Sequence, residues 1–190
     1  MSIVSVAVLL TGCSTGDDAV AQGGTFEFVA PGGKTDILYD PPASRGRPGA
    51  ISGPELTDPS KTVSLDDFRG DVVVVNVWGQ WCGPCRSETR ELQKVYDATK
   101  AKGVAFLGID VRDNNRQSAV DFVVDRKVTY PSIYDPSMRT LLSIRGFPTG
   151  SIPSTIVIDK QGRVAHVWLE EITDSTQLVD TVSAIAAESA

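Results

Sequence analysis

The sequence is poor in metal ligands, in basic clusters and in long apolar runs. With one histidine and three cysteines, a zinc site around Cys82 and Cys85 would have only Cys13 and His166 to complete its four ligands, so no metal is expected. No apolar run reaches the ~20 residues of a transmembrane helix. A net charge of −6 and the absence of a nucleic-acid-binding motif argue against nucleic acid as a partner.

The residues that are present suffice for one well-packed domain. The chain has 190 residues, of which 41% are hydrophobic and 22% charged, enough for one core with an additional arm. Its most apolar stretch begins at Val72, where five of six residues are valine. A run this apolar is typical of a strand that is covered on both faces, as in the sheet of an α/β protein.

Two cysteines follow this strand at the spacing of a redox centre. Gly83 and Pro84 separate Cys82 from Cys85, and Pro is well tolerated in the first turn of a helix. Cys82 is therefore expected at a helix N-terminus, where unpaired N–H groups favour a thiolate and lower the pKa of the thiol. We predict that Cys82 is the exposed attacking sulfur and that Cys85, one turn further in, resolves the mixed disulfide. Trp81 would offer a flat apolar surface to a partner chain.

Other uses of a cysteine pair fit less well. Attachment of a c-type haem requires His directly after the second cysteine, and Arg86 stands there. A purely structural disulfide would not usually occupy a junction between a strand and a helix with Gly-Pro between its cysteines. A redox function is the prediction that remains.

The N-terminal residues predict a lipid anchor. An apolar run from Ile3 to Leu10 leads into Leu-Thr-Gly-Cys-Ser, the pattern of a bacterial lipoprotein, so residues 1–13 are expected to be a signal peptide and Cys13 the lipidated residue. The first basic residue is Lys34, from which we expect that residues are missing upstream. The alternative is a fortuitous apolar N-terminus. Residues 14–55 are expected to hold a linker and a β-hairpin of 25–29 and 35–39 around Pro31–Lys34.

The motif Trp-Cys-Gly-Pro-Cys after an apolar strand resembles thioredoxin. The longer pattern from Val75 to Arg86 resembles the membrane-tethered TlpA/ResA/CcmG (DsbE)-like family, over residues 56–190. The resemblance implies a thioredoxin-like α/β fold, with a central mixed sheet, helices on both faces and an inserted helix over residues 118–127. Asn76 stands where general thioredoxins carry a buried Asp that accepts a proton, so any proton relay here must use another group.

The resemblance also implies further site residues. A carboxylate in the loop after the next strand lies near the cysteines in this family, and Asp113 is the candidate, although the family usually has the longer Glu there. The alternative for Asp113 is a solvated loop residue that caps the next helix. Pro153 is expected to be cis and to face the cysteines, with Ile152 lining the groove for the partner. His166 alternates with Val164 and Val167, which favours an exposed side chain.

We therefore expect a monomeric thiol–disulfide oxidoreductase without a cofactor, lipid-anchored on the extracytoplasmic face of the cell membrane. The resemblance implies a reductant that passes electrons from a membrane donor to the cysteines of apocytochrome c. The main alternative is an oxidase that forms disulfides in exported proteins. A peroxiredoxin-type peroxidase would need Thr where Gly79 stands, and a docking lipoprotein with a purely structural disulfide is the last alternative.

Overall fold

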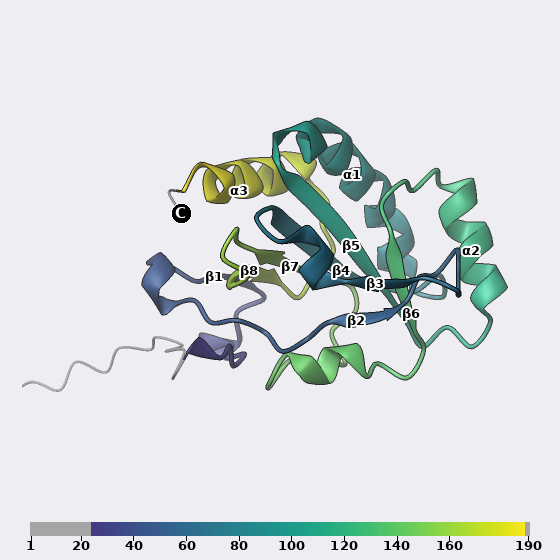
Figure 1. Ribbon diagram of the computed structural model, residues 1–190, viewed down its shortest axis with the longest axis horizontal. Helices are drawn as coiled ribbons and strands as arrows, with labels where there is room; N and C mark the ends of the chain where they lie inside the picture. The colour runs from purple at the N-terminus through teal and green to yellow at the C-terminus, as the bar shows by residue number, and fades with distance from the viewer. Residues whose placement is uncertain (1–23, 189–190) are drawn as a thin grey trace, which may run out of the picture.

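A computed structural model describes residues 24–188, so the predicted signal peptide and Cys13 lie outside the described residues. The core is a six-stranded mixed sheet in the order β1-β8-β7-β4-β5-β6 (Figure 1). Its strands are β1 (Asp36–Leu38), β4 (Val72–Trp78), β5 (Val104–Val111), β6 (Ser132–Asp135), β7 (Ser154–Ile158) and β8 (Val164–Trp168). The predicted thioredoxin-like α/β fold is confirmed.

The valine-rich strand β4 lies at the centre of this sheet, as its composition predicts. It pairs in parallel with β5 and antiparallel with β7, and all seven of its residues are buried. Because side chains alternate along a strand, Val73 and Val75 enter one hydrophobic cluster, and Val72 and Val74 enter another on the opposite face. The strand therefore links both halves of the core and fixes the position of its own C-terminal end.

Three α-helices cover one face of the sheet: α1 (Gly83–Thr99), α2 (Arg116–Asp125) and α3 (Ser175–Ala187). Helices α1 and α3 run side by side (Figure 1). Helix α2, the predicted inserted helix, packs Phe122 against Trp78 at the end of β4. The 3-10 helices η4 (Leu65–Phe68) and η6 (Thr140–Ser143) pack on the other face. No helix among the described residues is long and apolar enough to cross a membrane.

The N-terminal arm does not form the predicted hairpin. Residues 25–29 form isolated bridges to Arg47 and Arg145, whereas β1 adds to the edge of the main sheet beside β8. Gly32 and Gly33 both have positive φ angles and make a 3-10 turn, η2 (Pro31–Gly33), which does not bring the two segments together. The prediction was wrong because alternating residues reveal a strand but not its partner.

A two-stranded sheet forms further along the arm, from β2 (Ser52–Pro54) and β3 (Thr62–Ser64). The 3-10 helix η3 (Pro42–Ser44) precedes this sheet. Outside the arm, the 3-10 helix η5 (Lys100–Lys102) follows α1 and is capped by Gly103, which has a left-handed conformation. Phe26, Tyr39 and Ile51 of the arm join the same core cluster as Val73 and Val75. The arm is thus part of the folded core.

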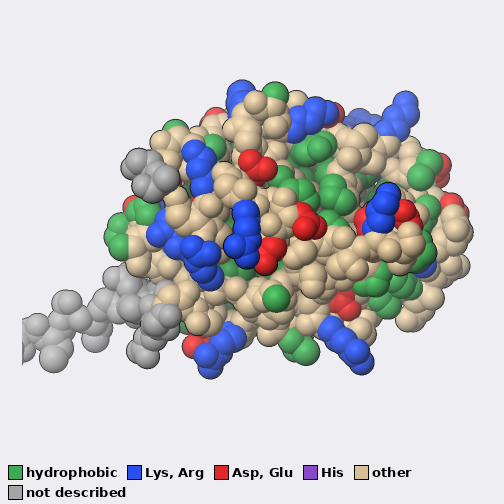
Figure 2. Space-filling model, viewed as in Figure 1, with side chains coloured by type: hydrophobic (Ala, Val, Ile, Leu, Met, Phe, Trp, Pro, Cys, Tyr) green, Lys and Arg blue, Asp and Glu red, His purple; other side chains and the backbone are tan. Residues whose placement is uncertain are grey.

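On the face drawn in Figure 2, basic and acidic side chains are interspersed.

The prediction that His166 is exposed was wrong. Its ring is stacked on Trp168 at 3.7 Å between centroids, and its Nε2 lies 2.5 Å from Oδ1 of Asp36. The sequence around His166 did not reveal that β1 pairs with β8 and brings Asp36 to it. Burial lowers the pKa of His166, against the opposing effect of Asp36.

Candidate active site

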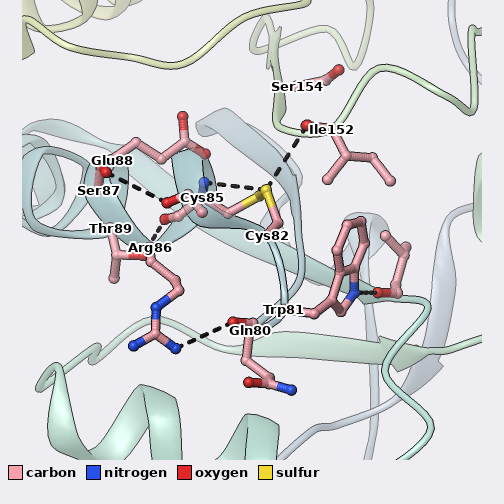
Figure 3. The surroundings of a disulfide bond; sticks show 12 residues. Gln80, Trp81, Cys82, Cys85, Arg86, Ser87, Glu88, Thr89, Ile152 and Ser154 are labelled. Carbon is pink, nitrogen blue, oxygen red and sulfur yellow. Dashed lines mark hydrogen bonds between the residues drawn. A yellow bond between two sulfur atoms is a disulfide. The ribbon is translucent and has the colours of Figure 1, made fainter.

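The cysteine pair lies where β4 ends and α1 begins. Cys82 is the N-cap residue of α1, and its Sγ accepts a hydrogen bond from the backbone N–H of Cys85 at 3.2 Å (Figure 3). The two cysteines form a disulfide. The helix N-terminus points at the sulfur of Cys82, so a thiolate formed there on reduction would be stabilised by the N–H of Cys85 and by the helix dipole. Gly83 and Pro84 occupy the first turn of α1, as predicted.

The structure corrects the prediction that Cys82 is exposed. Cys82 is 4% exposed and Cys85 is 1% exposed. In the disulfide state both are therefore buried, against Trp78 at the end of β4 and against Phe122 and other apolar residues of α2. The carbonyl oxygen of Ile152 lies 3.9 Å from Sγ of Cys82 (Figure 3). The sequence pattern placed the cysteine at a helix end but did not show that α2 and the loop before β7 cover it.

Trp81 is the exposed apolar residue beside this buried disulfide. Its side chain is 44% exposed, and its Nε1–H donates to the carbonyl oxygen of Val111 at 2.8 Å. This hydrogen bond fixes the indole against the end of β5. Gly79 makes room for it, because a Cβ at that position would lie 2.4 Å from Nε1 of Trp81.

The loop before β7 carries the second element of the site. The Ile152–Pro153 peptide bond is cis, as the resemblance implies, and Ile152 packs partly buried against the cluster that contains both cysteines. This arrangement places the backbone of Ile152 directly beside Cys82. An extended segment of a partner could pair with this backbone while its own sulfur meets Cys82.

Asn76 contacts a buried acid that sequence reasoning did not identify. Its Nδ2 donates to Oε1 of Glu88 at 2.8 Å, and Oε2 of Glu88 accepts from the backbone N–H of Ile172 at 3.0 Å. Glu88 is 1% exposed, and burial raises its pKa to about 7, although both hydrogen bonds oppose the shift. A group with this pKa can gain or lose a proton near neutral pH.

Glu88 could have been found from the sequence. It stands three residues after Cys85 and four before Leu92, so it lies on the helix face that carries the apolar residues. A carboxylate on the buried face of an amphipathic helix is unusual and predicts either a partner or a shifted pKa.

Asp113 also lies close to the cysteine loop. It is 3% exposed, and its carboxylate accepts hydrogen bonds from the backbone N–H of Gln80 at 3.1 Å and from Nε2 of Gln80 at 3.2 Å. The alternative of a solvated capping residue is wrong, because Asn115 is the N-cap of α2. The structure therefore places Ile152 and Pro153 beside Cys82, Trp81 in the loop that carries it, Asp113 against that loop, and Asn76 on Glu88, one turn of α1 beyond Cys85. Among residues 24–188, no group of acidic, His or Cys side chains is placed to hold a metal.

Comparisons with known proteins agree with this site. Residues 51–167 match the model of the AhpC/TSA family. The chain is 32% identical over 147 residues to the thiol:disulfide interchange protein DsbE of Allochromatium vinosum, covering 71% of this chain and 74% of that protein. It is 30% identical over 113 residues to the thiol-disulfide oxidoreductase ResA of Bacillus cereus, covering 60% of this chain and 63% of the relative.

A solved structure extends the likeness over more of the chain. A secreted thiol-disulfide isomerase from Corynebacterium glutamicum superposes with a TM-score of 0.83 at 45% identity, covering 87% of this chain and all of that one. A family match over more than half of the sequence, the shared fold and a disulfide at Cys-X-X-Cys spacing on a helix N-terminus point to one conclusion. The chain belongs to the AhpC/TSA family of thioredoxin-like proteins and is a relative of the ResA and DsbE thiol–disulfide oxidoreductases.

Proposed function

We propose that this protein catalyses thiol–disulfide exchange outside the cytoplasm, as a reductant of the oxidised Cys-X-X-Cys-His segment of apocytochrome c. The observation that carries the exchange chemistry is the Cys82 sulfur, which caps a helix N-terminus and faces the backbone of Ile152. The thiolate of Cys82 attacks a partner disulfide and forms a mixed disulfide, and the partner's other sulfur leaves as a thiolate. Cys85 then loses its proton, displaces the partner's second sulfur and closes the Cys82–Cys85 disulfide.

The direction of electron flow is argued from the charges around the disulfide. Glu88 is a buried acid one turn after Cys85 on α1, and Asp113 is a buried acid bonded to Gln80, two residues before Cys82. A nearby carboxylate disfavours a thiolate. The reduced form is thereby destabilised relative to the disulfide, which lowers the reduction potential. DsbA is a strong oxidant, at about −120 mV, for the opposite reason, because its reduced form is stabilised.

The likeness to ResA and DsbE supports the cytochrome c substrate. The proposal includes a membrane protein that donates electrons. Each reaction leaves Cys82 and Cys85 as a disulfide, which must be reduced before the next one. The extracytoplasmic location is supported by the lipoprotein pattern that ends at Cys13, and by the secreted relative from Corynebacterium.

The reduction potential and a peptide assay test the direction. The reduced protein is mixed with an oxidised peptide that contains Cys-X-X-Cys-His, and the redox states of both are followed by mass. We expect electrons to flow to the peptide, with a potential near the ~−270 mV of thioredoxin. A potential near ~−120 mV, with net oxidation of the reduced peptide, would instead establish the disulfide-forming oxidase.

Two cysteine variants provide matched controls for this assay. Cys85→Ser should accumulate a mixed disulfide between Cys82 and the peptide, because the resolving thiol is missing. Cys82→Ser should accumulate none.

The peroxidase alternative predicts consumption of peroxide by the reduced protein, which we do not expect because Gly79 and Trp81 leave no space for the Thr that such chemistry needs.

Lipidation of Cys13 is tested in cells with an alkyne-labelled fatty acid. We expect the label on the wild-type protein in the membrane fraction and neither label nor membrane association for Cys13→Ser. Equal labelling and fractionation of the two proteins would refute the anchor. The exchange chemistry of the isolated protein would not be affected by that result.

A further inference from the structure

Asp110 is a buried carboxyl group that the exchange mechanism does not use. It lies near the end of β5, its exposed fraction is 0%, and neither of its oxygens has a hydrogen-bond donor within the part of the chain that the structure describes. It is in register with Trp78 of β4 and Tyr134 of β6. Because neighbouring residues across a sheet point to the same face, Asp110 lies on the face of Trp78, which packs with both cysteines.

A second buried carboxyl group, Asp113, lies in the loop three residues after Asp110. Both residues adjoin Tyr134, which is in register with Asp110 and donates its hydroxyl to the backbone of Asp113, and the charge of Asp113 acts on Asp110. Asp113 differs from Asp110 in its hydrogen bonds, because it accepts two from Gln80. Gln80 lies two residues before Cys82, so these bonds attach Asp113 to the loop that carries the attacking sulfur. The hydroxyl of Tyr134 donates to the backbone carbonyl of Asp113 at 2.8 Å and holds this loop in place.

Few other charged groups surround the two acids. From α2, the guanidinium of Arg116 lies over the ring of Tyr134 and donates to the backbone carbonyls of Glu55 and Leu56. Arg112 points to Met138 and to the carbonyl of Thr149. From β4 the neighbour is Trp78, and from β6 it is Tyr134. No cation in the described part of the chain forms a salt bridge with either acid, so the charge of the pair is not neutralised directly.

Two adjacent buried carboxyl groups cannot both ionise near neutral pH without a large electrostatic cost. Asp113 has the donors that stabilise an anion, whereas Asp110 has none. Burial, followed by repulsion from Asp113, raises the pKa of Asp110 to about 9. Asp110 is therefore the member of the pair that keeps its proton at pH 7.

We propose that Asp110 and Asp113 act as one carboxylic acid–carboxylate pair, in which Asp110 holds a single proton and limits the negative charge facing Cys82 to that of Asp113. Asp110 is a positioning residue in this account, because it acts on Cys82 through Asp113. The inference requires that Cys82 and Cys85 exchange disulfides, but it does not depend on the direction, substrate or location proposed above.

The first test compares two nearly isosteric variants, Asp110→Asn and Asp113→Asn, in the reduced full-length protein. The pKa of Cys82 is obtained from the pH dependence of its alkylation by iodoacetamide, with the modified cysteine identified by mass spectrometry. Asn at position 110 mimics the protonated acid, so below pH 8 the acid dissociation constant of Cys82 should stay close to wild type. Removing the charge of Asp113 should raise that constant by about threefold or more, since opposing charge is lost at short range in a medium of low dielectric.

Two results of this comparison would overturn the proposal. An increase for Asp110→Asn as large as that for Asp113→Asn would show that Asp110 is charged. An unchanged constant for Asp113→Asn would show that the pair does not act on Cys82.

The second test uses the wild-type protein and does not rely on the stability of a variant. The side-chain carboxyl carbons of aspartate are labelled with ¹³C, and the Asp110 resonance is identified by its loss in Asp110→Asn or, if that variant does not fold, by through-bond correlation. We expect it to keep the chemical shift of a protonated acid at pH 7 and to titrate only in the alkaline range. Titration near the ordinary aspartate pKa of ~3.9 would refute the assignment. Neither test uses a partner, so a failed reductase assay would leave this result unaffected.

Discussion

Replacing Glu88 with Gln should change how the stability of the protein depends on pH. Burial raises the pKa of Glu88 to about 7 in the folded protein, against an ordinary value of 4.5. Between these two values the unfolded chain loses the proton while the folded protein keeps it, so ionisation increasingly favours the unfolded state. The contribution of Glu88 to stability is therefore greatest below pH 4.5, falls as the pH rises to 7, and is nearly constant above.

The size of this effect follows from the two pKa values. With one pKa unit worth about 1.4 kcal/mol, the free energy of unfolding of the wild type should fall relative to that of Glu88→Gln by about 3 kcal/mol between pH 4 and pH 8. Gln at position 88 also accepts the hydrogen bonds from Asn76 and Ile172 less well, which costs stability. That cost is the same at both pH values, so it cancels in this difference.

Urea unfolding of the oxidised proteins, followed by tryptophan fluorescence, measures this difference. Keeping the disulfide closed in both states removes thiol ionisation from the comparison. Glu91→Gln is the matched control on the same helix, because Lys94 lowers the pKa of Glu91 and its pH effect has the opposite sign. If the curves of wild type and Glu88→Gln stay parallel from pH 4 to pH 8, the argument for a buried acid with a raised pKa is wrong.

Other substitutions test the packing around the site and the arm. Gly79→Ala should displace the Trp81 indole and lower stability by about 1–3 kcal/mol in urea unfolding, because its Cβ would lie 2.4 Å from Nε1, whereas Gly83→Ala, with nothing within 4 Å, should be tolerated. Equal stabilities would contradict this. Arg45→Ala should cost about 3–5 kcal/mol, because the guanidinium is 1% exposed and paired with Asp159 and Glu188. The exposed Arg69→Ala should cost less than about 1 kcal/mol by the same measurement, and a similar loss for both would refute the role of the buried ion pair.

The sequence predicted those features that depend on local chemistry. The valines of β4 required a strand with two covered faces, and the Gly-Pro pair placed a helix N-terminus at Cys82. In each of these cases the residues that determine the structure lie within one or two turns of each other in the chain.

Features that depend on distant contacts were missed or predicted wrongly. Residues 25–29 and 35–39 each looked like a strand, but their partners lie far along the chain, near residue 145 and in β8. The burial of His166 follows from that same pairing. Cys82 is covered by α2 and by the loop at Ile152, more than thirty residues away in sequence. The buried acids near the cysteines were predicted only in part. Asp113 came from a family resemblance, and Glu88 was overlooked although its place on the apolar face of the helix could have revealed it. Asp110 required the three-dimensional arrangement.

The central claim is that the N-terminus of α1 makes Cys82 an acidic nucleophile, and its thiol pKa tests this most directly. The rate of alkylation of Cys82 in the reduced wild-type protein, measured from pH 4 to pH 10, gives that pKa. We expect a midpoint clearly below the ~8.5 of a free cysteine, with Cys82 reacting before Cys85. A midpoint at or above ~8.5, or preferential reaction of Cys85, would contradict the account.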